Sequence, residues 1–225
     1  HIQAVIFDLD DTLYLERDYA FSGFRAVASS FRDALGDPQA AFRRMCRLFD
    51  RERRHRVFDE MLRDLGRGED RALVRSMIDC YRAHRPSISL LPDARAALNR
   101  LRGSHRIGLV TDGPGHQQRA KIDALGLCAS FDVLIITGEL GSGAGKPSSR
   151  AFEAVMEHLG LTAAACAYVA DNAGKDFVAP NRLGWRSVHV VRPEGIYHGE
   201  SAPPGGEAHF AITSLDELDA LIGEA

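Results

Sequence analysis

A short apolar run that ends in a cluster of carboxylates constrains this chain more than any other feature. Residues 5–7 are Val-Ile-Phe and lead directly into Asp8, Asp10 and Asp11. Such a run of β-branched and aromatic residues predicts a strand buried on both faces, as in a parallel sheet. Ligands of open α/β sheets bind beyond the carboxyl ends of the strands, where three like charges need a cationic partner. A divalent cation such as Mg²⁺ suits these oxygens, and a solvated acidic turn is the alternative.

The pattern of hydrophobicity then becomes helical for about seventy residues, in which we expect no strand. From Pro92 onward, predicted strands alternate with predicted helices. We expect strands at residues 106–111, 131–137, 167–170 and 187–191, and helices at residues 92–102, 115–125, 148–159, 176–183 and after Ser214. The alternation predicts right-handed βαβ units in an α/β fold, with a Rossmann-like parallel sheet and helices on both faces.

Two domains follow from this division of the chain. Residues 1–15 and 89–225 are expected to form the α/β domain, and residues 16–88 an inserted all-helical domain. The segment 193–206 is rich in Gly and Pro, so we expect an irregular loop there.

Composition excludes several classes of function. The net charge of −3 gives no global basic field for nucleic acid, and no apolar run approaches the length of a membrane span. The four cysteines show no CxxC spacing and are expected to be reduced thiols. With no signal-peptide pattern, we expect a cytoplasmic protein, either monomeric or homodimeric, that binds neither nucleic acid nor membrane.

Four groups of polar residues follow the predicted strands. They are Asp8 with Asp10 and Thr12, Thr111 with Asp112 and Gly113, Lys146 with Pro147, and Asp171 with Asp176. Singly, each is ordinary: a strand-end threonine, a surface lysine or an acidic turn. Jointly, at the shared edge of a parallel sheet, they predict a catalytic site. A compact ammonium among carboxylates suits a phosphoryl oxygen.

At these same positions the sequence resembles a known family. Asp8-Leu9-Asp10-Asp11-Thr12, Val110-Thr111, Gly145-Lys146-Pro147, and Asp171 with a second Asp five residues later resemble, in order, the four signature motifs of the haloacid dehalogenase-like superfamily. The helical insertion directly after the first motif resembles the helical cap found in one class of that superfamily.

The resemblance implies a role for each carboxylate. Asp8 is expected to attack phosphorus and form an aspartyl-phosphate, and it needs no base, because a free Asp has a pKa of about 3.9. Asp10 is expected to protonate the leaving oxygen and then to deprotonate water. We therefore expect a raised pKa for Asp10, caused by a neighbouring carboxylate.

The resemblance also implies the groups that hold the phosphate and the metal. Thr111 and Lys146 are expected to bind phosphoryl oxygens, together with backbone amides around Leu9 and Asp112. Asp8, the backbone carbonyl of Asp10, Asp171 and Asp176 are the residues expected at a Mg²⁺ site.

The residue at position 10 distinguishes between chemistries within the family. Dehalogenating members carry a different residue there, because an alkyl halide needs no proton on its leaving group. Asp10 resembles the phosphatases and phosphomutases. We therefore predict a Mg²⁺-dependent phosphatase of a small phosphorylated metabolite, with a sugar phosphate phosphomutase and a non-catalytic binding module as alternatives.

Three features depart from the family's common pattern, and one of them is Ala170, which stands where Gly often precedes the metal-binding Asp. Asp112 stands where Asn is common in the family, which adds negative charge near the phosphate. The loop 138–145 is Gly-rich, but Pro147 follows Lys146, so the P-loop pattern fails.

The arginines between Arg43 and Arg56 are interpreted as a solvated face, with contact to an anionic substrate as the alternative.

Overall fold

The computed structural model describes residues 1–50, 56–68 and 70–223, and the chain divides into two compact units. One unit comprises residues 1–16 and 89–225, and the other comprises residues 17–88. Among the described helices, none is both long enough and apolar enough to cross a bilayer.

The first unit is built on a parallel sheet. Its strands in the described residues are β1 (Ala4–Phe7), β2 (Arg106–Thr111), β3 (Val133–Ile136), β4 (Cys166–Ala170), β5 (Arg186–Val190) and β6 (Phe210–Ile212). They lie in the order β3-β2-β1-β4-β5-β6, and each neighbouring pair is parallel. This is the strand order of a doubly wound Rossmann-like sheet, which confirms the predicted fold class.

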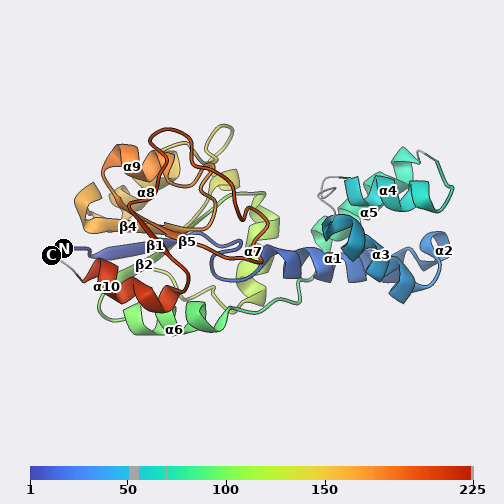
Figure 1. The fold of residues 1–225 in the computed structure, drawn as a ribbon, viewed down its shortest axis with the longest axis horizontal. Coiled ribbons are helices and arrows are strands. Elements are labelled where there is room, and N and C mark those ends of the chain that lie inside the picture. Colours follow the sequence, from blue (N-terminus) through green and yellow to red (C-terminus); the bar gives the residue numbers. More distant parts are fainter. Residues whose placement is uncertain (51–55, 69, 224–225) are drawn as a thin grey trace. The chain divides into compact units, whose positions relative to one another are not determined.

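Helices cover both faces of this sheet. They are α6 (Pro92–Leu101), α7 (Gly115–Ala124), α8 (Arg150–Leu159), α9 (Val178–Leu183) and α10 (Leu218–Ile222). In Figure 1, α8 and α9 lie on one side of the sheet and α6 and α10 on the other. Ser214 and Glu217 form a capping box at the short 3₁₀ turn that leads into α10, so Ser214 begins this last helical segment as expected.

The core between α8, α9 and the sheet is aromatic. Phe152 of α8 packs edge-on against Tyr168 of β4 and against Trp185, with ring centroids 4.9 Å and 5.4 Å apart. All three side chains are buried. Edge-to-face pairs of this kind add stability beyond the apolar area that they bury. The packing fixes β4, which carries Asp171 at its carboxyl end.

Two elements differ from the sequence-based expectation. Strand β6 was not expected, because three residues are too few for a recognisable alternation. The strand expected at 131–137 is shorter, because Thr137–Glu139 turns into a 3₁₀ helix.

The direction in which successive strands are added to the sheet reverses between β1 and β4. This reversal determines where the crevice of the fold lies. β2 and β3 lie on one side of β1, whereas β4 to β6 lie on the other. The backbone N–H of Asp8 donates to the carbonyl of Val169 at 2.9 Å, so the end of β1 is fixed beside the end of β4. Ligands of doubly wound folds bind at this reversal, beyond the carboxyl ends of the strands.

Within its described residues, the second unit contains helices and no strand. It contains nearly all of α1 (Glu16–Ser30), and α2 (Arg32–Leu35), α3 (Pro38–Asp50), α4 (Val57–Asp64) and α5 (Arg71–Ala83). A turn at Phe31 separates α1 from α2. Gly23 lets α1 and α5 approach closely, because a Cβ there would lie 2.4 Å from the Tyr81 ring. The aromatic cluster around this contact comprises Phe21, Phe24, Phe49, Phe58 and Tyr81.

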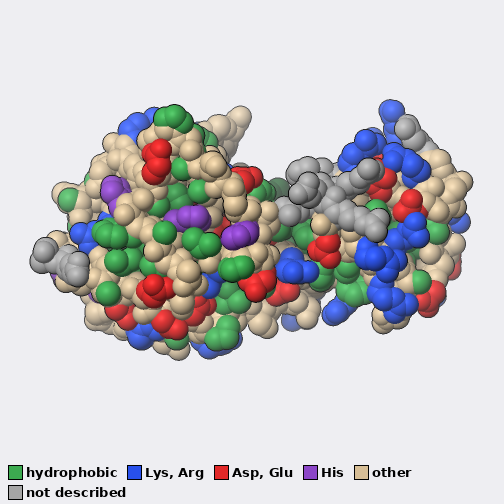
Figure 2. All heavy atoms as spheres, viewed as in Figure 1, with side chains coloured by type: hydrophobic (Ala, Val, Ile, Leu, Met, Phe, Trp, Pro, Cys, Tyr) green, Lys and Arg blue, Asp and Glu red, His purple; other side chains and the backbone are tan. Residues whose placement is uncertain are grey.

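The visible face of this helical unit is rich in basic side chains (Figure 2), and all of these are arginines because the unit contains no lysine. Arg43 and Arg47 are exposed, and Arg44 Nε donates to Asp64 at 2.9 Å. These three side chains behave as a solvated, partly ion-paired face does. Arg51, Arg53 and Arg54 of the same run lie outside the described residues.

Candidate active site

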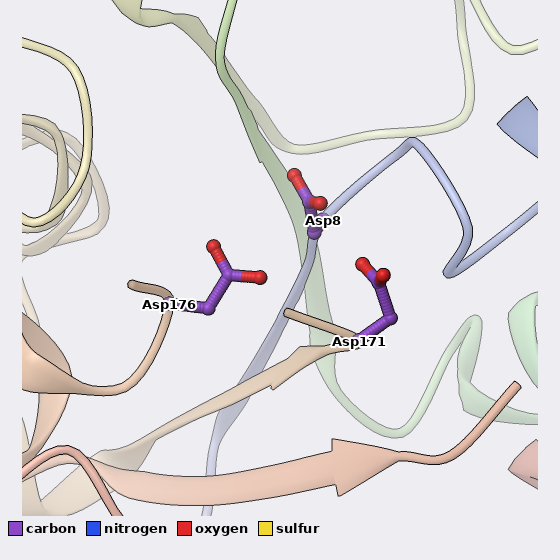
Figure 3. Close-up of side chains that lie close together, drawn as sticks. All are labelled: Asp8, Asp171 and Asp176. Atoms are coloured by element: carbon purple, nitrogen blue, oxygen red, sulfur yellow. The ribbon is translucent and has the colours of Figure 1, made fainter. Parts of the chain in front are cut away.

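The carboxyl ends of three neighbouring strands bring the residues of the sequence motifs together. Asp8 follows β1, Thr111 is the last residue of β2, and Asp171 follows β4. The carboxylates of Asp8, Asp171 and Asp176 face a common space in Figure 3. The sheet thus delivers side chains that are far apart in the sequence to one small region.

The turn after β1 separates the carboxylates of the first motif. Asp11 adopts a left-handed backbone conformation with φ of 51°. Its carboxylate accepts the backbone N–H of Glu16 at 2.8 Å and of Ile196 at 2.6 Å. Asp11 therefore fixes the loop and the start of α1. Its carboxylate is not part of the acidic cluster that its position in the sequence suggested.

Asp8, Asp171 and Asp176 form a buried acidic group. One oxygen from each carboxylate lies within 4.8 Å of the others. Burial raises the pKa of Asp8 to about 7, and burial together with Asp8 raises the pKa of Asp171 well above its usual range. In the absence of a cation, these surroundings favour the neutral form of Asp8, and its role as an unassisted carboxylate stays a prediction.

A hard divalent cation fits this donor set. Asp176 Oδ1 is buried and accepts no hydrogen bond within the described residues, although Lys146 Nζ lies 2.7 Å away. A cation among these oxygens would complete their coordination and reverse the effect of burial on the pKa values. The side chain of Asp10 does not belong to this group.

Lys146 lies at the centre of the same region. The loop before it returns to the sheet and ends in a cis peptide bond to Pro147. Lys146 Nζ donates to Asp8 Oδ1 at 2.9 Å and to the Tyr168 hydroxyl at 3.0 Å. Burial opposes its charge, but Asp176 and Asp8 outweigh burial and raise the pKa of Lys146 well above its usual range. Lys146 therefore stays a cation next to Asp8.

Asp10 is held by side chains that the sequence did not identify. Its Oδ1 accepts from Lys121 Nζ at 2.7 Å and from the Tyr14 hydroxyl, and its Oδ2 accepts from Gln118 Nε2 at 3.0 Å. Burial favours the neutral form, but Lys121 and these hydrogen bonds prevail and hold the pKa of Asp10 below its usual range. The raised pKa expected from a neighbouring carboxylate is thus wrong, because an ammonium is the nearest charge.

The two residues of the second motif that are expected to bind phosphate, Thr111 and Asp112, lie in different environments. Thr111 is fully buried, and its Oγ1 accepts from Gln118 Nε2 at 2.6 Å. Asp112 Oδ1 accepts from the Thr137 hydroxyl at 2.9 Å and from the Lys146 N–H at 3.1 Å. Asp112 therefore ties the second motif to the loop that carries Lys146.

The extra charge at position 112 is compensated locally. Lys175 Nζ lies 2.7 Å from Asp112 Oδ2. Burial raises the pKa of Asp112, but Lys146 and Lys175 outweigh it and lower the pKa below its usual range. Asp112, which stands where Asn is common in the family, is thus paired with a lysine.

All three lysines of the chain lie in this site. The other 25 of the 28 basic residues are arginines. Lys121 pairs with Asp10, Lys146 with Asp8 and Asp176, and Lys175 with Asp112. Of these three lysines, only Lys146 was expected at the site, although the rarity of lysine in the sequence was a signal that could also have identified Lys121 and Lys175.

A cavity of about 150 Å³ opens above these groups. Its lining includes the motif residues Asp8, Asp10, Asp112, Lys146 and Asp171. The remaining lining residues are Glu16, Asn172, Lys175 and Tyr197. Leu9 and Thr111 do not line it, so their expected contacts with phosphate stay predictions.

A larger cavity of about 560 Å³ lies at the opposite edge of the sheet, next to the start of β2. Its lining includes His1, His105 and Arg106, with Asp132 as its one carboxylate. Because it lies at the amino ends of the strands and its lining includes only one carboxylate, it lacks the features of a site in this fold.

Comparison with known proteins gives an independent result. Residues 2–184 match the family described as haloacid dehalogenase-like hydrolase. The chain is 28% identical over 229 residues to a glyceraldehyde 3-phosphate phosphatase of Methanocaldococcus jannaschii, covering 98% of this chain and 97% of that protein. It is 35% identical over 146 residues to a phosphoserine phosphatase of Thermus thermophilus, covering 63% of this chain and 57% of that protein.

Solved structures show the same fold at lower identity. The HAD-hydrolase YfnB of Bacillus subtilis is 18% identical, with a TM-score of 0.72 over all of both chains. The L-2-haloacid dehalogenase of Xanthobacter autotrophicus is 20% identical, with a TM-score of 0.63 over 99% of both chains. The ordered motifs, the sheet that joins them and the family match lead to one conclusion: the chain belongs to the haloacid dehalogenase-like hydrolases.

Proposed function

We propose that the protein is a Mg²⁺-dependent phosphatase that hydrolyses a small phosphomonoester through an aspartyl-phosphate. One observation carries the proposal. Asp8 lines the cavity beyond β1 with Lys146 at 2.9 Å and two further carboxylates beside it. This arrangement supplies a nucleophile together with the positive charge and metal ligands that phosphoryl transfer needs.

In the first step, an oxygen of Asp8 attacks phosphorus and the bond from phosphorus to the ester oxygen breaks. Asp10 gives its proton to the departing oxygen, so an alcohol leaves and the phosphoryl group stays on Asp8. Asp10 must be protonated at this point. The negative phosphoryl group entering beside it raises its pKa relative to the free enzyme, because a nearby like charge favours the neutral form.

In the second step, water attacks phosphorus and the bond to Asp8 breaks. Asp10, now a carboxylate, takes the proton from that water. Inorganic phosphate leaves and the Asp8 carboxylate is restored. Lys121, 2.7 Å from Asp10, stabilises the carboxylate that this step requires.

Mg²⁺ would be held by Asp8, Asp171, Asp176 and the backbone carbonyl of Asp10. When bound, it supplies positive charge that keeps Asp8 ionised and stabilises the phosphoryl oxygens. Lys146 adds a second positive charge next to Asp8, and the backbone amides near Leu9 and Asp112 are proposed as donors.

The proposed substrate is a small phosphorylated metabolite. The two relatives described above are a glyceraldehyde 3-phosphate phosphatase and a phosphoserine phosphatase, and both of these substrates are small. Asp10 supports a reaction that protonates its leaving group, and so favours ester hydrolysis over dehalogenation. We propose that the helical unit serves as a cap that admits small substrates.

Four free cysteines agree with the predicted reducing, cytoplasmic location, which stays a prediction.

Phosphate release from a panel of phosphomonoesters tests the function. The panel contains sugar phosphates, nucleotides, phosphoserine, glyceraldehyde 3-phosphate and a phosphoprotein, each with Mg²⁺ and with EDTA. We expect Mg²⁺-dependent release from at least one small ester, and loss of that release in Asp8→Asn. Release of inorganic phosphate without a bisphosphate activator would distinguish a phosphatase from a phosphomutase.

Turnover that survives both EDTA and Asp8→Asn would contradict the proposed chemistry. Turnover of the phosphoprotein alone would contradict the proposed substrate class. No turnover of any ester would favour the non-catalytic binding module.

A further inference from the structure

Two polar side chains of α7 reach Asp10 from the same side. Gln118 and Lys121 are three residues apart and so share one face of the helix. Gln118 Nε2 donates to Asp10 Oδ2 at 3.0 Å, and Lys121 Nζ donates to Oδ1 at 2.7 Å. Both side chains are buried, with Gln118 only 2% exposed and Lys121 5%. A buried amide in this place needs an explanation, because burial of a polar group is costly without partners.

The amide of Gln118 has both of its hydrogens engaged. One is donated to Asp10, and the other to Thr111 Oγ1 at 2.6 Å. An ionised carboxylate only accepts hydrogen bonds, so the amide nitrogen, and not its oxygen, must face Asp10. The Thr111 hydroxyl at the end of β2 therefore anchors the amide, and the amide fixes one oxygen of Asp10.

The backbone makes room for this amide. Gly113 has a φ of +131°, and a Cβ on it would lie 3.3 Å from both Cγ and Cδ of Gln118. The glycine after the second motif thus allows the buried side chain to lie between β2 and the loop that carries Asp10.

We propose that Gln118 is a positioning residue that holds the Asp10 carboxyl group in line with the leaving oxygen of the substrate. This inference rests on the proposed phosphatase function. Misplacement of a reacting group by about 1 Å can cost about a hundredfold in rate. Because Gln118 is neutral, its replacement removes the positioning without changing the charge of the site.

The identity of the leaving group separates this role from a structural one. A p-nitrophenolate departs without a proton, whereas an alkoxide must be protonated as it leaves. Loss of alignment at Asp10 therefore slows alkyl esters much more than p-nitrophenyl phosphate. Partial unfolding lowers the turnover of both esters equally and leaves their ratio unchanged.

The test compares Gln118→Leu with the matched control Gln117→Leu on the same helix. For each variant, kcat/KM is measured with p-nitrophenyl phosphate and with an alkyl phosphate that the wild type hydrolyses. In Gln118→Leu we expect the ratio of the aryl to the alkyl value to rise on the order of tenfold or more. In Gln117→Leu, whose side chain is half-buried, we expect the ratio to stay within about twofold of the wild type.

A double-mutant cycle locates the effect at Asp10. Asp10→Asn removes the proton transfer, so adding Gln118→Leu to that variant is expected to leave the ratio unchanged. If Gln118→Leu fails to fold, the unbranched Gln118→Met takes its place in the same cycle.

Several results would overturn the inference. An unchanged ratio in Gln118→Leu, or an equal further shift in the Asp10→Asn background, would show that Gln118 does not act through Asp10. Failure of both Gln118 variants to fold would assign the residue a structural role. If the wild type hydrolyses neither ester, the proposed function itself fails, and this inference fails with it.

Discussion

Lys121 Nζ lies 2.7 Å from Asp10 Oδ1, and Lys121 is only 5% exposed. The lysine comes from α7, 111 residues further along the chain. This buried pair explains why the pKa of Asp10 is held below its usual range although burial acts in the opposite direction. In the free enzyme, Asp10 is therefore a carboxylate, the form that deprotonates water.

Lys121→Met is expected to destabilise the protein by about 3 kcal/mol at neutral pH, because it leaves a buried carboxylate unpaired. The folded-state pKa of Asp10 is depressed, so the pair stabilises the fold above the unfolded-state pKa of about 3.9, and this contribution is lost as the pH falls through the folded-state pKa. Denaturant melts at pH 7 and pH 3 should therefore show a large difference from the wild type at pH 7 and a smaller one at pH 3.

The control for this measurement is Arg119→Met on the same helix. Arg119 forms a surface pair with Glu139, so its replacement should change the free energy of unfolding much less than Lys121→Met does, and equally at both pH values. Equal losses in Lys121→Met at both pH values would contradict the assigned pairing with Asp10.

Mg²⁺ is expected to stabilise the protein more strongly as the pH rises. Burial raises the pKa of Asp8 to about 7, so without metal the ionisation of Asp8 destabilises the fold as the pH rises from about 4 to 7. A cation removes this penalty and binds only the deprotonated oxygens. The increase in Tm caused by Mg²⁺ should be greater at pH 8 than at pH 5. Asp176→Asn should reduce the increase, and an increase that is larger at pH 5 would argue against this metal site.

Asp112→Asn is expected to strengthen phosphate binding. Asn keeps an acceptor for the Thr137 hydroxyl and the Lys146 N–H, but it frees the charge of Lys175 from its 2.7 Å partner. We expect KM for a phosphomonoester to fall by about fivefold, which corresponds to about 1 kcal/mol for a partly exposed charge. Lys175→Met should raise KM, and the double variant should return it to near the wild-type value. A KM that rises in Asp112→Asn would show that the negative charge itself assists the reaction.

The sequence predicted the sheet and the motif residues because both depend on local patterns. The strand expected at Arg106–Thr111 has the same bounds in the structure, and α7 ends one residue before the helix expected at 115–125. The order of the strands and the three-residue β6 depend on pairing between distant segments, which no local pattern encodes.

The environment of each site residue was harder to predict than its position. Asp10 was expected to have a raised pKa because the sequence showed only carboxylates near it. Its actual partners, Tyr14, Gln118 and Lys121, are brought to it by the fold. Asp11 illustrates the reverse case, since a left-handed backbone turn removes its carboxylate from the acidic group that its sequence position suggested.

The central claim is that Asp8 is the nucleophile, and identification of the phosphorylated residue tests it most directly. The protein is mixed with Mg²⁺ and a ³²P-labelled ester from the panel, quenched in acid during turnover, and digested for peptide mapping. We predict that the label is found on the peptide that contains Asp8, and that it is absent in Asp8→Asn. Label on another residue, or full turnover with no labelled peptide at any quench time, would contradict the account.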